Sequence, residues 1–502
     1  MGVDNRQKQG CRKAERIPFE PDLDNASVGR RNRTESIGHI PSRVCLFLLK
    51  VVTMEMKRVL TVAGSDSSGG AGIQADLKTI SALGAYGMSV ITALTAQNTL
   101  GVQGIHEVPA DFVAAQFDSV VDDIGVDAVK TGMLANSEII KTVADKLKEC
   151  GIVKVVVDPV MVAKSGSPLL APESRETLVR ELLPLAIVLT PNIPEAEELS
   201  GIAISSEAQM REAARKIYAL GVRHVLVKGG HLMGQATDVL FDGYDFHVFS
   251  SERIRTSDTH GTGCTYASAI ATYLAQGLSV YDAVDRAKKF LTFSIRHSLR
   301  LGGGQGPTNP MAHLLRESER WRCFTALREA VARLVKEDCG NIIPEVQSNL
   351  GYALPRASGK DDVAAFPGRI IRFGSGARPV EAPAFGASSH ISKIILTAMK
   401  YDETYRSAMN IRFSEEAVDA CRELGFHVES FDRSCEPPET KLREGSSLEW
   451  GTDKVLARGA GMPDIIFDNG DVGKEPMIRV LGRSPDDVVE KVIRISKKLK
   501  ER

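Results

Sequence analysis

The fold is set by a stretch near residue 60, which reads Val59-Leu-Thr-Val-Ala-Gly-Ser-Asp-Ser-Ser-Gly-Gly-Ala-Gly72. Its first residues, Val59 to Val62, are apolar or β-branched and predict a buried strand. A glycine-rich turn follows, and the next apolar residues recur at helical spacing: Ile73, Leu77, Ile80 and Leu83. A strand, a turn and a helix in this order predict the first unit of an α/β domain.

The same alternation continues outward from this stretch. Further strand-like runs are 89–94, 127–130, 154–157, 187–189 and 224–227, and they are nearly continuously apolar, as in parallel strands covered on both faces. We therefore expect a three-layer α/β/α sandwich with a mostly parallel central sheet and sites at the carboxyl ends of its strands. Asp242-Gly243 lies between two alternating runs in 237–249 and predicts a hairpin.

The chain is predicted to divide into four parts. Residues 1–53 are rich in Arg, Asn, Asp and Ser without periodicity and are expected to be a disordered extension. Residues 54–315 form the first domain, and 316–343 a charged amphipathic helix that links the domains. A smaller second α/β domain is expected over 344–502, where Pro485 opens the closing helix.

Composition narrows the possible partners. The 502 residues carry a net charge of −1, which gives no bulk attraction to nucleic acid or to an anionic membrane. The apolar run 44–52 contains Lys50 and is far shorter than the roughly 20 residues of a spanning helix. The eight cysteines are scattered without a Cys-x-x-Cys pair. We expect a cytoplasmic protein without structural zinc and with small-molecule partners, for which a homodimer is one candidate assembly.

A second glycine motif, Asp258-Thr-His-Gly-Thr-Gly-Cys264, runs into an alanine-rich apolar segment. Glycines on both sides of Thr262 let consecutive backbone N–H groups point in one direction, and a following helix adds its positive N-terminal end. This pattern predicts an anion site. A helix that begins at Cys264 would also favour the thiolate form of its first residue.

The glycine-rich turn 63–72 has neither the Gly-x-Gly-x-x-Gly spacing nor that of a P-loop, so alone it is weak evidence for nucleotide binding. Asp76, one helical turn later, is placed to accept hydrogen bonds from a ligand hydroxyl or amino group. The alternative for Asp76 is a favourable charge near a helix N-terminus.

Seven motifs together resemble the hydroxymethylpyrimidine/phosphomethylpyrimidine kinases, which are ribokinase-like enzymes of thiamine biosynthesis. The resemblance covers about residues 56 to 315, and the motifs occur in the family's order: 63–76, Thr92-Ala-Leu-Thr-Ala-Gln-Asn-Thr99, Lys130-Thr-Gly-Met133, Asp158-Pro-Val160, Thr190-Pro-Asn-Ile-Pro-Glu195, Val227-Lys-Gly-Gly-His231 and 258–264. It implies ATP-dependent phosphorylation of 4-amino-5-hydroxymethyl-2-methylpyrimidine and then of its monophosphate. A pyridoxal-type kinase is the alternative for this domain.

The resemblance also implies roles for single residues. Gly64, Asp76, Gln97 and Met133 would contact the pyrimidine, Met133 as an apolar wall if it is not simply core. Asn192 and Lys228 would bind ATP, and Glu195 with Asp158 would lie near Mg²⁺, although a strand-ending Asp-Pro is also a common turn. The anion hole would comprise Gly261, Thr262, Gly263 and Cys264. There Cys264 takes the place of an aspartate base.

The second domain has a stretch dense in arginine and glycine, Gly368-Arg-Ile-Ile-Arg-Phe-Gly-Ser-Gly-Ala-Arg-Pro379, followed by His390. Arginines offer planar contacts to phosphates, but one or two of these are expected to be solvated. With 399–402, 406–411 and 461–464, the stretch resembles the thiamine-phosphate synthase domain fused behind such kinases. The resemblance implies coupling of the pyrimidine diphosphate to a thiazole phosphate, with Arg369 and His390 as catalytic candidates. A domain that only binds a pathway ligand and regulates is the alternative.

Overall fold

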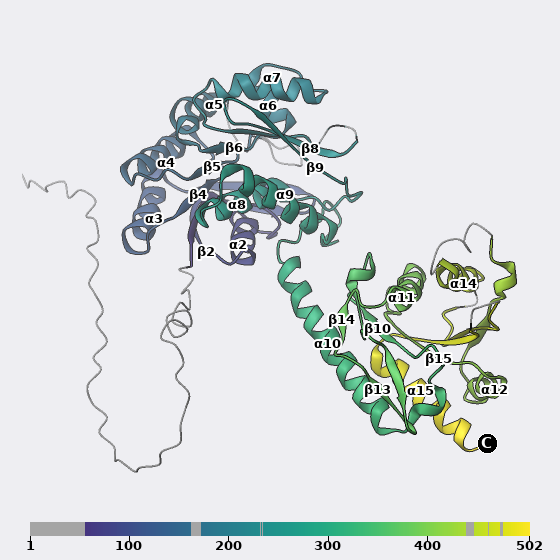
Figure 1. Ribbon diagram of the computed structural model, residues 1–502. Coiled ribbons are helices and arrows are strands. Elements are labelled where there is room, and N and C mark those ends of the chain that lie inside the picture. Colours follow the sequence, from purple (N-terminus) through teal and green to yellow (C-terminus); the bar gives the residue numbers. More distant parts are fainter. Residues whose placement is uncertain are drawn as a thin grey trace, which may run out of the picture. The chain divides into compact units, whose positions relative to one another are not determined.

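The computed structural model describes residues 56–161, 172–230, 232, 234–437, 446–459, 461–471 and 475–502. The predicted disordered extension, residues 1–53, lies outside the described residues. The chain divides into two compact units between His313 and Leu314. Figure 1 shows a layered α/β arrangement in each unit.

The front unit is built on a nine-stranded sheet in the order β3-β2-β1-β4-β5-β6-β7-β8-β9. Strands β2, β1, β4, β5, β6 and β7 pair in parallel, whereas β3, β8 and β9 are antiparallel additions at the two edges. The strands are β1 (Arg58–Asp66), β2 (Tyr86–Asn98), β3 (Gly101–Glu107), β4 (Ala128–Thr131), β5 (Val155–Val157), β6 (Val188–Leu189), β7 (Val225–Lys228), β8 (Ala236–Phe241) and β9 (Phe246–Ser251).

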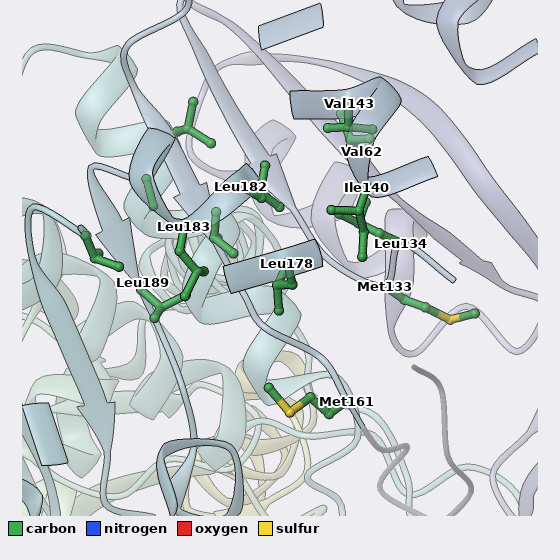
Figure 2. Packing of buried hydrophobic residues seen from close by; sticks show 14 of the residues in the cluster. Val62, Met133, Leu134, Ile140, Val143, Met161, Leu178, Leu182, Leu183 and Leu189 are labelled. Carbon is green, nitrogen blue, oxygen red and sulfur yellow. The ribbon is translucent and has the colours of Figure 1, made fainter. Parts of the chain in front are cut away.

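Helices cover both faces of this sheet, and each face has its own apolar core. On one face lie α3 (Ala110–Asp123), α4 (Ser137–Glu149), α6 (Ile193–Ser200) and α7 (Glu207–Tyr218), whose buried residues form a cluster with one set of strand side chains. Figure 2 shows part of this cluster, including Leu134, Ile140 and Leu182. On the other face lie α2 (Gly72–Ala82), α8 (Thr262–Ala275) and α9 (Val280–Arg296). The short helix α5 (Pro172–Thr177) precedes a turn of wider helix.

The predicted three-layer sandwich with a mostly parallel sheet is therefore confirmed. Each predicted strand-like run of the front unit coincides with a strand, and the hairpin at Asp242-Gly243 joins β8 to β9. Strand β3 was not predicted. It is an edge strand whose residues are mostly exposed, so it lacks the apolar alternation that identifies a half-buried strand.

The rear unit has a smaller mixed sheet in the order β14-β11-β10-β15-β18-β17-β16, in which only β16 and β17 pair in parallel. A separate hairpin pairs β12 (Ile370–Phe373) with β13 (Gly376–Pro379). The sheet strands are β10 (Leu350–Ala353), β11 (Val363–Ala365), β14 (Ala384–Phe385), β15 (Ser407–Arg412), β16 (Val428–Ser430), β17 (Ile465–Asp468) and β18 (Met477–Gly482). The helices are α11 (Ser389–Tyr401), α12 (Glu415–Glu423), α14 (Ser446–Leu456) and α15 (Pro485–Lys500).

The helix predicted as a linker over 316–343 is present as α10 (Ala312–Lys336), but it is not a free spacer. Its buried residues Leu327, Val331 and Leu334 lie in the same core cluster as Val488 and Val492 of α15. The sequence indicates that the helix is amphipathic, but it does not show which core the apolar face joins. The helix therefore contributes to the core of the rear unit. Among the described residues, no helix combines the length and apolarity needed to cross a membrane.

Candidate functional site

A cavity of about 1010 Å³ opens in the front unit where the parallel strands end. It receives residues from the ends of β1, β2 and β7 and from the segments that follow β5 and β6, as expected for an open α/β sheet. Eleven of the predicted site residues line it: Gly64, Gln97, Met133, Asp158, Asn192, Glu195, Lys228, Gly261, Thr262, Gly263 and Cys264. The fold thus brings together motifs that are far apart in the sequence.

Residues 261–264, which we call the anion turn, form a tightly packed part of the cavity lining. Gly261 is the N-cap of α8 and has φ 78°, a left-handed conformation that glycine adopts without strain. A Cβ on Gly261 would lie 1.9 Å from the carbonyl oxygen of Gly70, so a side chain cannot be accommodated there. The two glycine-rich turns therefore touch, and the start of α8, with its positive N-terminal end, belongs to the cavity lining.

The prediction for Cys264 needs two corrections. Helix α8 begins at Thr262, not at Cys264, so the thiol stands in the third helical position. The expected thiolate is also wrong, because burial raises the pKa of Cys264 to about 11, against the opposing effect of Lys130. A helix N-terminus stabilises a thiolate only where desolvation does not outweigh it. With its pKa raised in this way, the thiol form of Cys264 is favoured at neutral pH.

Lys228, Asp158 and Glu195 form the charged floor beside that turn. Lys228 Nζ lies 2.8 Å from Asp158 Oδ1, and the Thr190 hydroxyl donates to the same oxygen. Burial tends to raise the pKa of Asp158, but Lys228 and Lys130 hold it below its usual value. A Cβ on Gly263 would lie 3.2 Å from Asp158 Oδ2 and 3.5 Å from Lys228 Nζ, which shows how closely this pair approaches α8.

Asn192 and Glu195 form a capping box at the start of α6. The Asn192 side chain accepts from the Glu195 backbone N–H at 2.9 Å, and the Glu195 carboxylate accepts from that of Asn192 at 2.8 Å. Burial raises the pKa of Glu195 to about 7, and nearby Asp158 adds to this effect while Lys228 opposes it. A bound cation would favour the ionised carboxylate.

These carboxylates fit a sparse magnesium site. No group of three or more His, Cys, Asp or Glu side chains that would hold a metal occurs within the described part of the chain. Magnesium is commonly held by one or two carboxylates together with waters and substrate phosphates, and Glu195 and Asp158 supply such hard oxygen donors. In the structure, the Asn192 backbone N–H donates to Glu195 and Lys228 pairs with Asp158.

Asp76 differs from its predicted role. Its carboxylate is fully buried, does not line the cavity, and accepts from Thr61 and Ser268 at 2.7 Å and from Lys130 at 2.9 Å. These partners occupy the oxygens that were expected to contact a ligand. Asp76 instead fixes Lys130, a cavity residue on the buried strand β4 that belongs to one of the seven motifs but was not predicted as a site residue.

Another part of the cavity lining carries polar groups next to an apolar wall. Met133 lines it beside Gly64, where a Cβ would lie 3.3 Å from the methionine sulfur. Figure 2 labels Met133 next to Leu134 of the apolar cluster, so its backbone is anchored in the core. Gln97 lies near His260, and His260 contacts Asp66. His260 and Asp66 were missed, although both belong to the motifs that were singled out.

The rear candidates stand on separate elements. Arg369 lies just before β12 with φ 69°, and its guanidinium donates to the carbonyl of Val346. His390 is an exposed residue in the first turn of α11. Arg372 lies on β12 and Arg378 on β13, the two strands of the hairpin. The guanidinium carbon of Arg378 lies 5.6 Å from the centre of the Phe373 ring. The roles of Arg369 and His390 stay predictions.

Comparisons with known proteins agree with this division. Residues 66–309 match the family model for phosphomethylpyrimidine kinase, and residues 326–494 match that for thiamine-phosphate synthase ThiN. The hydroxymethylpyrimidine/phosphomethylpyrimidine kinase of Streptomyces coelicolor is 53% identical over 251 residues, which cover 50% of this chain and 93% of that protein. The chain belongs to the hydroxymethylpyrimidine/phosphomethylpyrimidine kinase family.

Other relatives of this kinase family extend the comparison. The thiamine biosynthesis bifunctional protein ThiED of Geobacter sulfurreducens is 60% identical over 252 residues, which are 50% of this chain and 51% of that protein. The chain thus spans about half the length of that relative. Among solved structures, a phosphomethylpyrimidine kinase from Clostridium difficile 630 is 48% identical and covers 47% of this chain and 98% of its own, with a TM-score of 0.43. An ADP complex of Bacillus subtilis pyridoxal kinase is 43% identical, covers 52% of this chain and 100% of its own, and has a TM-score of 0.49.

Proposed function

We propose that the front unit phosphorylates 4-amino-5-hydroxymethyl-2-methylpyrimidine with ATP and then phosphorylates the monophosphate to the diphosphate. The observation that carries this proposal is one continuous cavity that joins the amide of Gln97 and the wall of Met133 to the anion turn 261–264. The first end suits a pyrimidine with an exocyclic amine, because an amide both donates and accepts. The second end suits a phosphoryl group in transfer.

In this mechanism the chain acts mainly by position and charge. Phosphoryl transfer often passes through a loose transition state with charge on the equatorial oxygens, which the α8 backbone N–H groups and Lys228 would stabilise. Glu195 and Asp158 would hold Mg²⁺, and the ion would supply positive charge to offset that of the ATP phosphates. Since burial keeps Cys264 a thiol, with a pKa of about 11, we rank the anion turn above the thiol in importance.

The test is a steady-state assay of the full chain with ATP, Mg²⁺ and the pyrimidine. We expect the monophosphate to appear first and the diphosphate to follow. Turnover of the purified monophosphate distinguishes this activity from that of a pyridoxal-type kinase, which phosphorylates a vitamin once. Phosphorylation of pyridoxal with rejection of the pyrimidine monophosphate would contradict the proposal.

We propose that the rear unit is a thiamine-phosphate synthase, which joins the diphosphate to a thiazole phosphate with release of pyrophosphate. The match of residues 326–494 to the synthase family model supports this assignment. Arg369 would bind the departing diphosphate through planar charged contacts, and His390 would contact its other phosphate.

The synthase reaction needs no ATP, so the full chain can be assayed without the kinase step. Incubation with the pyrimidine diphosphate and the thiazole phosphate should give thiamine phosphate and pyrophosphate. Binding of either substrate without product would favour a rear unit that only senses a pathway ligand.

A further inference from the structure

The Gln97 side chain lies between two polar neighbours at the pyrimidine end of the cavity. In the structure its amide nitrogen is 3.3 Å from His260 Nε2, and its amide oxygen is 3.1 Å from Thr95 Oγ1. Oxygen and nitrogen of an amide have nearly the same shape, so their order is decided by the hydrogen-bond network around them. Both neighbours of Gln97 have a second partner that determines what they can offer.

His260 is committed as a donor on this side. The same Nε2 atom that faces Gln97 lies 3.0 Å from Asp66 Oδ2. Asp66 is an acceptor, since its carboxylate also accepts hydrogen bonds from the backbone N–H groups of Gly70 and Ala71. Burial opposes ionisation of Asp66, but the hydrogen bonds that it accepts, from His260 among others, lower the pKa of Asp66 to about 2. Nε2 therefore carries a hydrogen, and it would meet the Gln97 NH₂ group donor to donor.

Thr95 is committed as an acceptor. Its hydroxyl lies 2.9 Å from the carbonyl oxygen of Ser65 and 3.1 Å from the Gln97 amide oxygen as placed, and both oxygens only accept. The hydroxyl has a single hydrogen, and the shorter contact assigns it to Ser65. The lone pairs that face Gln97 then call for an N–H donor. The two neighbours independently favour the same reversed order of the amide.

We propose that His260, held by Asp66, is a positioning residue that turns the Gln97 amide so that its oxygen faces His260 and its nitrogen faces Thr95. The amide then offers the cavity an acceptor on the His260 side and a donor on the Thr95 side. This order matches the edge of a 4-aminopyrimidine, whose exocyclic amine donates and whose adjacent ring nitrogen accepts. The ligand in this inference rests on the proposed kinase function, whereas the orientation of the amide does not.

The assigned order also directs the substrate. The amine at C4 would lie toward His260, and the neighbouring C5 hydroxymethyl group would then point along the same loop toward the anion turn that begins at Gly261. His260 itself is well fixed, because its backbone N–H donates to Gly306 and a Cβ on Gly70 would lie 2.5 Å from its ring. A 4-oxo analogue presents the inverse order, with an acceptor at C4 and a donor at the ring nitrogen.

The first test observes the hydrogens directly. Neutron diffraction from crystals of the full chain exchanged into D₂O should show deuterium on His260 Nε2 directed at Asp66, and both amide deuterons of Gln97 on the Thr95 side. Amide deuterons on the His260 side would overturn the proposal. This result is independent of any activity.

The second test compares kcat/KM for the 4-amino pyrimidine with that for its 4-oxo analogue. We expect preference for the amine to fall about tenfold in His260→Leu, the effect of one mismatched buried polar group, and to recover in His260→Gln, whose amide again donates. A general disturbance of the anion turn would slow both substrates and leave the ratio unchanged, which would overturn the proposal.

His247→Leu is the matched control, because His247 pairs with Asp242 at 3.1 Å on the β8–β9 hairpin outside the cavity lining. Its preference for the amine should equal that of the unaltered chain. If the unaltered chain phosphorylates neither pyrimidine, the proposed function fails, and the neutron result alone decides the orientation of the amide.

Discussion

Lys130 Nζ lies 2.9 Å from Asp76 Oδ2, and both side chains are fully buried. Asp76 also accepts from Thr61 and Ser268, which belong to different elements from each other and from Lys130. The pair therefore links β1, α2, β4 and α8 at one point. Burial would lower the pKa of Lys130, but Asp76 and the other nearby acidic groups raise it overall.

Removing one partner of this pair should be costly. We expect Asp76→Asn to lower the free energy of unfolding by about 3–5 kcal/mol, because Lys130 keeps a buried charge without its counter-ion. Urea unfolding of the full chain followed by circular dichroism measures the change. The double variant Asp76→Asn with Lys130→Met should regain part of the loss.

The control for this comparison is Asp285→Asn, which breaks the exposed pair between Asp285 and Lys289. Solvent-exposed pairs contribute at most about 1 kcal/mol, so this variant should unfold almost as the original chain does. Equal losses in both variants would show that the buried pair has no special role.

Gly261→Ala should nearly abolish kinase turnover. The new Cβ would meet the Gly70 carbonyl, so the anion turn must move, and loss of one oxyanion donor typically slows catalysis by about 10² to 10³. Gly277, just beyond the other end of α8, also has a positive φ of 93° but has open space around its Cα. Gly277→Ala should therefore keep kcat and cost only backbone strain of about 1 kcal/mol.

Cys264→Ala should lower kcat with little change in KM for the pyrimidine. The thiol lines the cavity at the start of α8, whereas substrate recognition is assigned to two other lining residues, Gln97 and Met133. The kcat ratio between variant and unaltered chain is measured across pH 6 to 9. An unchanged kcat over this range would leave Cys264 with a packing role only.

Alkylation should report the protonation state of Cys264. With a pKa of about 11, the thiol is protonated at pH 8 and ionises as pH rises, so its reaction with iodoacetamide should accelerate about tenfold per unit between pH 8 and 10. Peptide mass spectrometry on the unliganded full chain separates Cys264 from the exposed Cys435. A rate that levels off below pH 9 would contradict the raised pKa.

Arg369→Ala should impair the rear unit alone. Loss of a charged partner for the departing diphosphate should slow formation of thiamine phosphate by about 100-fold or more, with unchanged kinase turnover. Arg372→Ala, which removes an exposed arginine three residues later within β12, is the control. Equal effects of the two substitutions would favour a general electrostatic contribution over a specific contact.

The sequence predicted those parts of the front unit that depend on local periodicity. The runs at 59–62 and 224–227 became β1 and β7, and the motifs at their ends meet in the cavity because parallel strands end at one edge. The short rear strands, such as β11 and β14, carry too few residues to show a pattern. The mainly antiparallel strand order of the rear sheet could not be predicted either, because local sequence patterns do not show which strands pair.

For the site, the sequence could not predict contacts between residues that are distant in the chain, or the burial of single side chains. In the sequence, Asp76 is a helix residue without an identifiable partner. In the structure its carboxylate accepts hydrogen bonds from Lys130 and Ser268, which are both distant in the chain. Cys264 has a favourable place near a helix start, but its burial decides its pKa. The sequence assigns no role to His260, because its contact with Asp66 at the end of β1 appears only in the folded chain.

The placement of α10 bears on how the two units can be separated or recombined. Because Leu327 and Leu334 belong to the rear core, a gene fragment that starts after residue 343 would encode a rear unit lacking one wall. A cut near His313 instead respects both cores. Exchange of modules between such fusion proteins should therefore succeed at junctions before this helix and fail at junctions after it.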